Sequence, residues 1–213
     1  MTLEEFTNNA RRTVLSNKSF NKLFGIGYNK TGTTTLERVL RRYGYALPNQ
    51  QIQESRLTKQ CFATNYSEFT DFVSRFDAFQ DLPFSQGSVY VAADALFPNS
   101  KFILTERASD DWFRSISTFH QKAFAFSDPS ELTEQDILER FDYLYPGYMH
   151  ENKTRLLSTF DGATRRVDWS KLYDKAYYVQ QYEERNAAIK KYFMNAPDKL
   201  LVIDVTKEPT TER

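Results

Sequence analysis

The sequence is poor in the residues that define several protein classes. Cys61 is the one cysteine among 213 residues, which excludes an intramolecular disulfide and suits a reducing compartment. We interpret it as a buried, unreactive thiol. No uninterrupted apolar run approaches the ~20 residues that span a bilayer, and the first residues lack the apolar segment of a signal peptide. The chain is therefore expected to be soluble, without a membrane partner.

The sequence also lacks an excess of charge. It has 28 Lys and Arg residues against 28 Asp and Glu residues, so its formal net charge is zero. No overall field would attract nucleic acid, and any anion site must be local. The length suits one domain with a substantial core, which predicts a single domain over 1–213 with its core at about 20–205.

The positions of possible N-glycosylation sites bear on the cellular compartment of the protein. Asn-x-Ser/Thr occurs at Asn17, Asn29, Asn65 and Asn152, and Asn29 lies in a loop that a glycan would block. This favours a cytoplasmic protein. A luminal domain without its anchor is the alternative.

Apolar patterning predicts an α/β fold. Apolar runs predict strands at 23–27, 78–80, 101–106 and 200–205. Helical spacing predicts helices over about the first 20 residues, with Phe6 and Leu15 inward, and at 33–43, 66–76, 89–96, 109–119 and 173–193. This order implies a mostly parallel sheet flanked by helices, with ligands at the carboxyl ends of the strands.

Two segments carry weaker signals. The polar stretch 46–70 is expected to be a surface excursion that leads into the helix at 66–76. The segment 123–173 is rich in Phe and Tyr and is broken by Pro and Gly, so we expect it to be irregular, with one short helix at 133–141. We interpret it as a lid region on the substrate side.

The segment Gly25-Ile-Gly-Tyr-Asn-Lys-Thr-Gly-Thr-Thr-Thr-Leu lies where the first strand hands over to a helix. Free backbone N–H groups and the positive end of the helix dipole converge there, which favours an oxyanion. Gly32 permits close approach of the backbone, Lys30 supplies a charge, and threonine hydroxyls add donors. The residues assigned to this phosphate loop are Lys30, Thr31, Gly32, Thr33, Thr34 and Thr35.

In this loop the lysine precedes the last glycine, whereas in the nucleotide-triphosphatase motif it follows that glycine. The order Lys-Thr-Gly-Thr-Thr resembles the 5′-phosphosulfate loop of sulfotransferases. That family also carries an arginine after a later strand and a serine eight residues on, which together hold the 3′-phosphate of the donor. Arg107 and Ser115 stand at that spacing.

The resemblance implies a sulfotransferase architecture similar to that of P-loop nucleotide triphosphatases. The donor would be 3′-phosphoadenosine 5′-phosphosulfate (PAPS), and the product would be 3′,5′-adenosine bisphosphate (PAP), without a metal. The acceptor would be the hydroxyl or amine of a small molecule or carbohydrate. The sequence does not indicate which acceptor, or an oligomeric state.

Two catalytic residues are expected. Lys30 suits stabilisation of the oxygen that leaves sulfur. In the soluble small-molecule branch of the family the base is a histidine at the end of the second core strand, and Asp81 of Gln80-Asp81-Leu82-Pro83-Phe84 occupies the similar position. Burial can raise the pKa of such a carboxyl to a useful value. The alternative is that Asp81 only caps the turn before Pro83.

Other polar residues have weaker claims. His120 and His150 are interpreted as incidental, Glu106 as the ion-pair partner of Arg107, and Asp204 as a mimic of a metal-binding aspartate. Two further functions stay open: a nucleotide kinase or triphosphatase that uses Mg²⁺, and an inactive relative that binds a nucleotide without turnover.

Overall fold

The computed structural model describes residues 18–207, so the predicted N-terminal helix with Phe6 and Leu15 lies outside the described residues. The backbone forms two compact units. The first comprises described residues up to Arg107 and those from Asn186 onward, and the second comprises Ala108 to Arg185. Within 18–207 no helix is both long and apolar enough to cross a membrane.

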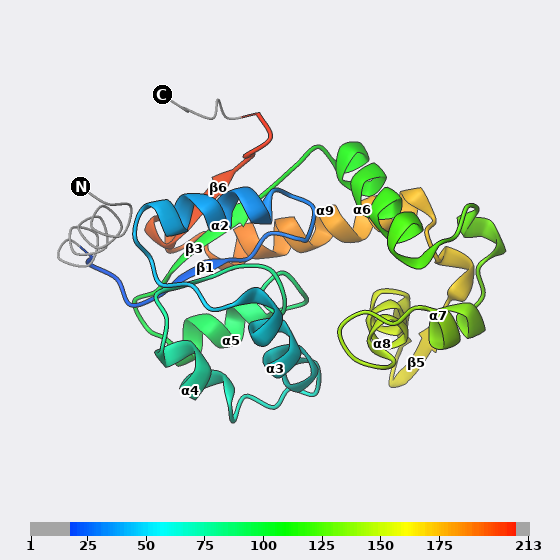
Figure 1. Cartoon of the computed structure of the whole chain (residues 1–213), viewed down its shortest axis with the longest axis horizontal. Coiled ribbons are helices and arrows are strands. Elements are labelled where there is room, and N and C mark those ends of the chain that lie inside the picture. Colours follow the sequence, from blue (N-terminus) through cyan, green and yellow to red (C-terminus); the bar gives the residue numbers. More distant parts are fainter. Residues whose placement is uncertain (1–17, 208–213) are drawn as a thin grey trace. The chain divides into compact units, whose positions relative to one another are not determined.

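A parallel sheet forms the centre of the first unit (Figure 1). Its four strands run in the order β2-β1-β3-β6, and Phe24 lies opposite both Phe79 and Phe102. The strands are β1 (Leu23–Gly25), β2 (Ala78–Phe79), β3 (Lys101–Thr105) and β6 (Leu200–Ile203). The fold class and all four predicted strands are confirmed, although each strand is shorter than predicted at its carboxyl end.

Side chains alternate between the two faces of this sheet, as the pleat requires. Leu23 and Ile103 pack with Leu36 and Leu40 of α2 (Thr33–Arg42) on one face. On the other face Phe24, Phe79 and Phe102 pack against α3 (Gln50–Phe62), α4 (Phe69–Ser74), α5 (Val89–Leu96) and the end of α9 (Lys175–Tyr192). Helices thus cover both faces, which leaves the carboxyl edge of the strands for a site.

The helical spacing of Leu36, Val39, Leu40 and Tyr43 predicts one apolar face on α2, and this prediction is only half correct. Leu36 and Leu40 are buried, whereas Val39 and Tyr43 are exposed. A helix of ten residues on a single sheet buries only a narrow stripe, and Tyr43 already lies at its C-cap. Glu37 and Arg41, four residues apart on the exposed side of the helix, pair at 2.9 Å, as their spacing in the sequence predicts.

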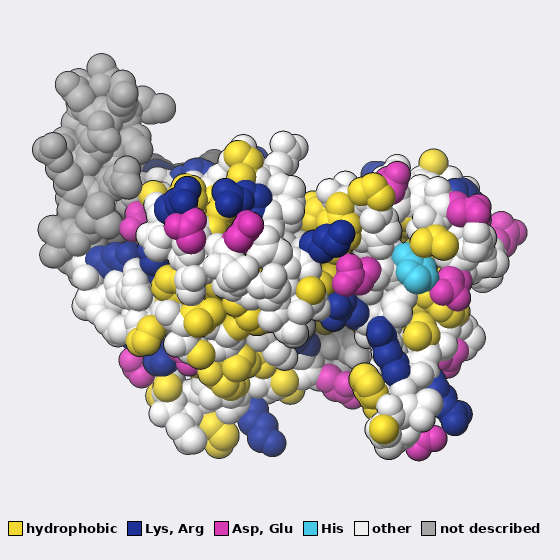
Figure 2. Space-filling view, turned by 90° about the horizontal axis from the view of Figure 1, so that it is seen from below, with side chains coloured by type: hydrophobic (Ala, Val, Ile, Leu, Met, Phe, Trp, Pro, Cys, Tyr) yellow, Lys and Arg dark blue, Asp and Glu magenta, His cyan; other side chains and the backbone are white. Residues whose placement is uncertain are grey.

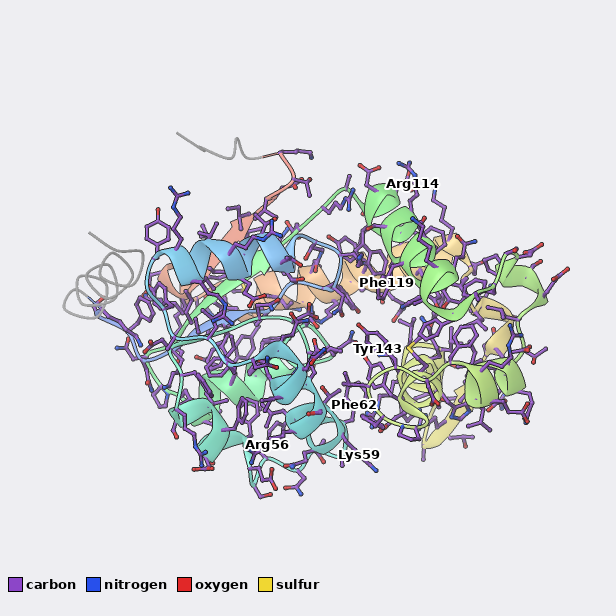
Figure 3. All side chains as sticks on the ribbon, in the orientation of Figure 1. Arg56, Lys59, Phe62, Arg114, Phe119 and Tyr143 are labelled. Carbon is purple, nitrogen blue, oxygen red and sulfur yellow. The ribbon has the colours of Figure 1, made fainter. Side chains whose placement is uncertain are left out.

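Residues 46–70 were expected to form a polar surface excursion, but they contain the helix α3. That prediction was wrong. Its first turn is capped by the side chain of Asn49, which accepts from the backbone N–H of Ile52 at 3.1 Å. Leu57 and Cys61 bury one face, and burial raises the pKa of the Cys61 thiol to about 12. Apart from Ile52, its exposed side chains are polar, such as Arg56 and Lys59 (Figure 3).

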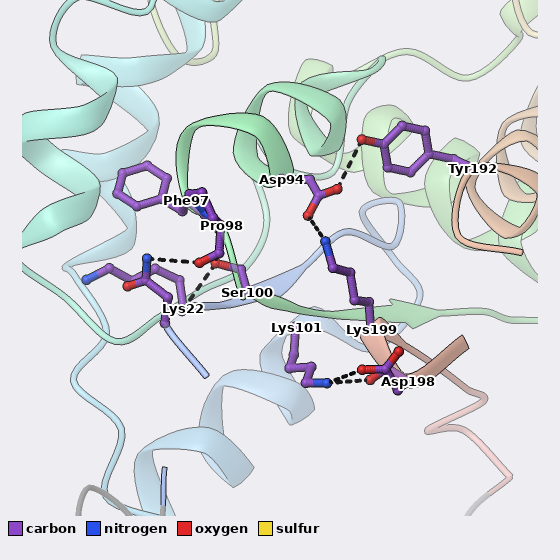
Figure 4. Close-up of polar contacts among 10 residues, drawn as sticks. Lys22, Asp94, Phe97, Pro98, Ser100, Lys101, Tyr192, Asp198 and Lys199 are labelled. Atoms are coloured by element: carbon purple, nitrogen blue, oxygen red, sulfur yellow. Dashed lines mark hydrogen bonds and ion pairs between the residues drawn. The ribbon is translucent and has the colours of Figure 1, made fainter. Parts of the chain in front are cut away.

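Polar contacts join the outer helices of the first unit to its strands (Figure 4). Asp94 of α5 accepts from the Tyr192 hydroxyl at 3.1 Å and from Lys199 at 2.8 Å. Lys101 at the start of β3 pairs with Asp198 at 2.9 Å. These contacts hold the end of α9 and the start of β6 against the rest of the first unit. The strand β6 completes its sheet.

The second unit is more regular than the predicted irregular segment. It contains α6 (Ser109–Phe124), α7 (Glu134–Arg140), α8 (Tyr148–Leu156), the antiparallel hairpin β4 (Ser158–Asp161) with β5 (Thr164–Val167), and the first part of α9. The predicted helix at 133–141 corresponds to α7. The helix α8 and the hairpin were not predicted, although the sequence carries a signal for each. Gly147 lies at the N-cap of α8, and Asp161-Gly162 forms the turn of the hairpin.

Aromatic rings fill the second unit. Trp112 of α6 stacks on Tyr182 of α9 with ring centroids 4.4 Å apart, and Phe119 meets Tyr143 edge to face at 6.2 Å (Figure 3). Lys153 of α8 is 2 % exposed and lies 4.8 Å from the ring centre of Tyr173. Burial lowers the pKa of Lys153 to about 7. Aromatic richness in this segment therefore serves a core.

Candidate functional site

The phosphate loop lies at the carboxyl end of β1, where residues 26–32 connect the strand to α2. Gly32 is the N-cap of α2, with a left-handed φ of 98° that favours glycine. A Cβ on Gly32 would also overlap the side chain of Val205. The first backbone N–H groups of α2 point out of the helix by its geometry, so the loop is built to face an anion.

The side chain of Thr31 holds the loop together from inside. It is fully buried, and its hydroxyl contacts the carbonyl of Tyr28 at 2.5 Å and the hydroxyl of Thr105 at 2.6 Å. Thr105 ends β3, the neighbouring strand. A Cβ on Gly27 would overlap Thr105, so the loop and β3 lie in close contact. Thr33 is also buried, whereas Thr34 is exposed.

Asp81 lies directly against this loop. Its carboxylate accepts from the Thr33 hydroxyl at 3.0 Å, from the backbone N–H of Leu82 at 3.0 Å, and from the side-chain amide of Asn29. The structure therefore brings together two segments that are about 50 residues apart in the sequence. Burial raises the pKa of Asp81, although the bonds from Thr33 and Leu82 and the charge of Lys30 oppose the shift.

Arg107 also reaches the phosphate loop. It follows β3 at the same edge of the sheet, and its guanidinium donates to the carbonyl oxygen of Lys30 at 3.5 Å. Lys30 itself has a φ of 69° and a half-buried side chain. Two cationic side chains and one carboxyl group thus gather around one helix N-terminus, which suits the binding of an anion next to a proton acceptor.

Comparison with known families agrees with this geometry. A family model described as a sulfotransferase domain matches residues 22–208, most of the chain. The chain belongs to the sulfotransferase domain family. A search of curated proteins gave no match. Sulfuryl transfer in general is the reaction of this family, and the match covers β1, the phosphate loop, Asp81, Arg107 and the last strand.

Ser115 of this sulfotransferase domain lies in the second compact unit. It is half-buried on α6. Arg107 belongs to the first unit, and the second unit begins at the next residue, Ala108. The pairing of Arg107 with Ser115 around one phosphate stays a prediction.

Three other polar residues, Glu106, Asp204 and His120, make contacts that bear on the roles expected for them. Glu106 was expected to pair with Arg107 but contacts Lys190 of α9 at 2.8 Å, a correction. Asp204 accepts from Thr206 and pairs with Lys207, which closes a local turn. His120 bonds to the Tyr173 hydroxyl at 3.0 Å inside the second unit. Among residues 18–207 no three His, Cys, Asp or Glu side chains gather as a metal site.

Three polar residues of α3, none of them predicted as site residues, lie beside Asp81 and the turn that carries it. Gln53 is buried and donates to the carbonyls of Gln80 and Leu82 at 2.7 and 2.6 Å, which clamps the turn that carries Asp81. The Gln50 amide donates to Glu54 at 2.8 Å and to Asp81 at 3.4 Å. The cap residue Asn49 followed by strong helix formers is the signal that would have predicted this helix.

The second unit has an open depression of about 380 Å³. Charged residues and aromatic residues both line it, among them Asp110, Arg114, Lys175, Phe113 and Tyr173. The Ser117 oxygen is buried and has no hydrogen-bond partner among residues 18–207, so it is not exposed to the depression.

Proposed function

We propose that the protein transfers a sulfuryl group from PAPS to an acceptor hydroxyl or amine. One observation carries the proposal: the Asp81 carboxylate is hydrogen-bonded to Thr33 of the loop that contains Lys30, while Arg107 contacts the same loop. This arrangement places a proton acceptor next to a cationic oxyanion site. Sulfuryl transfer needs both groups.

The donor would be held by the phosphate loop and Arg107 of the first unit, and a role for Ser115 at the 3′-phosphate stays a prediction of the sequence. The backbone N–H groups at the start of α2, with the hydroxyls of Thr34 and Thr35, would bind the 5′-phosphosulfate. Thr31 and Thr33 would chiefly shape the loop, since their hydroxyls bond to Thr105 and Asp81. The forked guanidinium of Arg107 suits the 3′-phosphate dianion.

Catalysis would divide between Lys30 and Asp81. Lys30 would stabilise the phosphate oxygen from which the sulfur departs, and Asp81 would take the proton of the acceptor as the new oxygen–sulfur or nitrogen–sulfur bond forms. PAP then leaves with the bridging oxygen. No step in this scheme uses a metal. The raised pKa of Asp81, caused by burial, suits a general base at neutral pH.

The acceptor side belongs to the same proposal. The acceptor would be a small molecule or carbohydrate, and the segment 123–173 is proposed to shape its binding because of its Phe and Tyr content. We further propose that the whole chain works as one sulfotransferase domain, without nucleic acid or a membrane, and in the cytoplasm. The buried, unpaired Cys61 agrees with a reducing compartment.

Calorimetric titration tests the donor site. PAP without metal is expected to bind, and ATP with Mg²⁺ is expected to bind more weakly. A preference for ATP with Mg²⁺ would move the assignment to a kinase or triphosphatase. Binding of neither nucleotide would favour an inactive relative.

Two variants test the assigned residues. Lys30→Ala is expected to abolish transfer and weaken donor binding. Arg107→Ala is expected to bind nucleotides with and without a 3′-phosphate equally, because its charge recognises that group. Arg42→Ala, exposed at the far end of α2, is the matched control. An Arg107→Ala protein that keeps the preference for a 3′-phosphate overturns the assignment.

A further inference from the structure

The side-chain amide of Asn29 joins the phosphate loop to the turn after β2. Asn29 comes directly before Lys30 in the loop, and it is half-buried. Its amide nitrogen donates to the Asp81 carboxylate. Its amide oxygen accepts from the hydroxyl of Ser85 at 3.2 Å and from the side-chain amide of Gln86 at 3.1 Å. One side chain of the loop therefore contacts the turn through both of its polar atoms.

The partners of Asn29 fix the direction in which its amide faces. An ionised carboxylate only accepts hydrogen bonds, so the amide nitrogen of Asn29 must face Asp81. The amide oxygen then faces two groups that can donate to it, those of Ser85 and Gln86. Backbone bonds make the turn itself firm, since Ser85 donates to the carbonyl of Asp81 at 2.9 Å and Gln86 donates to that of Pro83 at 3.1 Å.

The phosphate loop holds Asp81 at both of its carboxylate oxygens. Asn29 donates to one oxygen, and Thr33 at the start of α2 donates to the other at 3.0 Å. These two residues stand before and after the segment 30–32 of the loop. The carboxylate therefore bridges the two ends of that segment, so the shape of the loop and the place of the carboxyl group depend on each other.

Donors at the carboxylate also influence its charge. Burial raises the pKa of Asp81, and a hydrogen bond donated to the carboxylate favours its ionised form. Among the charged groups around it, Lys30 favours the ionised form, whereas Glu37 of α2 opposes it. Glu54 of α3 also repels it when both are ionised. A base must be ionised before it can take a proton, so a lost Asn29 donor would leave less of Asp81 ready to react.

We propose that Asn29 is a positioning residue for the proposed base: its amide nitrogen holds the Asp81 carboxylate on the loop that carries Lys30. Ser85 and Gln86 keep the amide in the orientation that this contact needs. This role deepens the proposed function and rests on it for the part of Asp81 in catalysis. The hold on the carboxylate is a property of the unliganded protein and is measured there.

Carboxyl-carbon NMR of the unliganded protein measures the hold on Asp81. The Asp81 signal is identified by its loss in Asp81→Asn. In Asn29→Ala the carboxylate loses a donor, so the midpoint of its titration should move to higher pH by roughly one unit. Ser85→Ala removes one of the two donors that orient the amide and should give a smaller shift in the same direction. Asn65→Ala, exposed after α3, is the control and should leave the midpoint unchanged.

A second variant keeps the shape of the side chain. Asn29→Asp retains an oxygen for Ser85 and Gln86 but replaces the donor to Asp81 by a second carboxyl oxygen. The two acids should then share a proton, and the Asp81 midpoint should rise further than in Asn29→Ala. A midpoint that does not rise in Asn29→Ala overturns the hold on Asp81, whatever the activity. Should that variant not fold, Asn29→Asp decides in the same way. An unmoved midpoint in Ser85→Ala overturns the orienting role of Ser85.

Activity then tests the link to catalysis. If Asp81 is the base, the acid limb of kcat/KM for PAPS in Asn29→Ala should move to higher pH by the same amount as the NMR midpoint. Activity on that limb should fall several-fold and recover as the pH rises, whereas a merely structural defect would lower activity at every pH. A shifted Asp81 signal with an unshifted acid limb retains the hold and overturns Asp81 as the base.

Discussion

Neighbouring threonines in the phosphate loop have different tasks. The hydroxyl of Thr33 is buried and donates to Asp81, whereas Thr34 is exposed at the next position of the same helix. Two identical residues side by side in the sequence therefore differ in role. Thr33 makes a structural contact, and the hydroxyl of Thr34 is available to a ligand. The distinction depends on where Asp81 lies in space, which no spacing within the loop reveals.

Replacing each threonine by valine separates the two tasks. Thr33→Val should lower the free energy of unfolding by about 2 kcal/mol, because a buried carboxylate loses a hydrogen bond. Thr34→Val should change it by less than about 0.5 kcal/mol, since an exposed hydroxyl loses little. Urea unfolding of the unliganded protein measures both values. Equal losses in the two variants would contradict the assigned contact.

The placement of the candidate site residues was predictable where local chemistry marks them. Lys30, Gly32 and Arg107 stand beside strand ends, and parallel strands place those ends at one edge. Asp81 was predicted from the segment before Pro83, and the structure puts it on the loop. Glu54 was not predictable, because a carboxylate within a polar helix ordinarily faces water. Its burial depends on which face of α3 meets the sheet.

At the scale of elements, apolar runs predicted the sheet well. All four strands were predicted, because buried parallel strands are almost continuously apolar. The helix α3 was missed since its buried face includes Gln53, Glu54 and Thr58, which interrupt any apolar spacing. The hairpin of β4 and β5 was missed because its strands are largely exposed and polar, which leaves the Asp-Gly turn as the signal.

Gln53 fixes the helix α3 to the turn that follows β2. Gln53→Leu should lower the free energy of unfolding by about 2 to 4 kcal/mol, because the buried carbonyls of Gln80 and Leu82 both lose their donor. Gln51→Leu, an exposed neighbour on the same helix, is the control. Thermal unfolding followed by circular dichroism compares them. If Gln53→Leu were as stable as the control, Gln53 would not fix the helix.

Across the whole molecule, charge is balanced on the surface but not in the interior. Basic and acidic side chains are interspersed on the face drawn in Figure 2, in keeping with a net charge of zero. Inside, Glu54 of the first unit and Lys153 of the second are buried away from strong opposite charges that would keep them ionised. Both groups therefore favour their neutral forms when folded.

These two groups predict an unusual dependence of stability on pH. The pKa of Glu54 rises from 4.5 to about 7 on folding, so the folded chain binds the proton more tightly and stability falls as pH rises through that window. The pKa of Lys153 falls from 10.5 to about 7, so the unfolded chain binds the proton more tightly and stability rises from pH 7 to 10.5. We expect a minimum of stability near pH 7.

Urea midpoints measured from pH 5 to 10 test this minimum. Glu54→Gln should flatten the acidic limb, and Lys153→Met should flatten the alkaline limb, because each removes the group that titrates there. At pH 7 Lys153→Met should also add a few kcal/mol to the free energy of unfolding, since a buried amine is replaced by an apolar chain of similar length. Lys122→Met, exposed near the end of α6, should leave both limbs in place. A stability maximum near pH 7 in the unmodified protein would show that neither group is held neutral by burial.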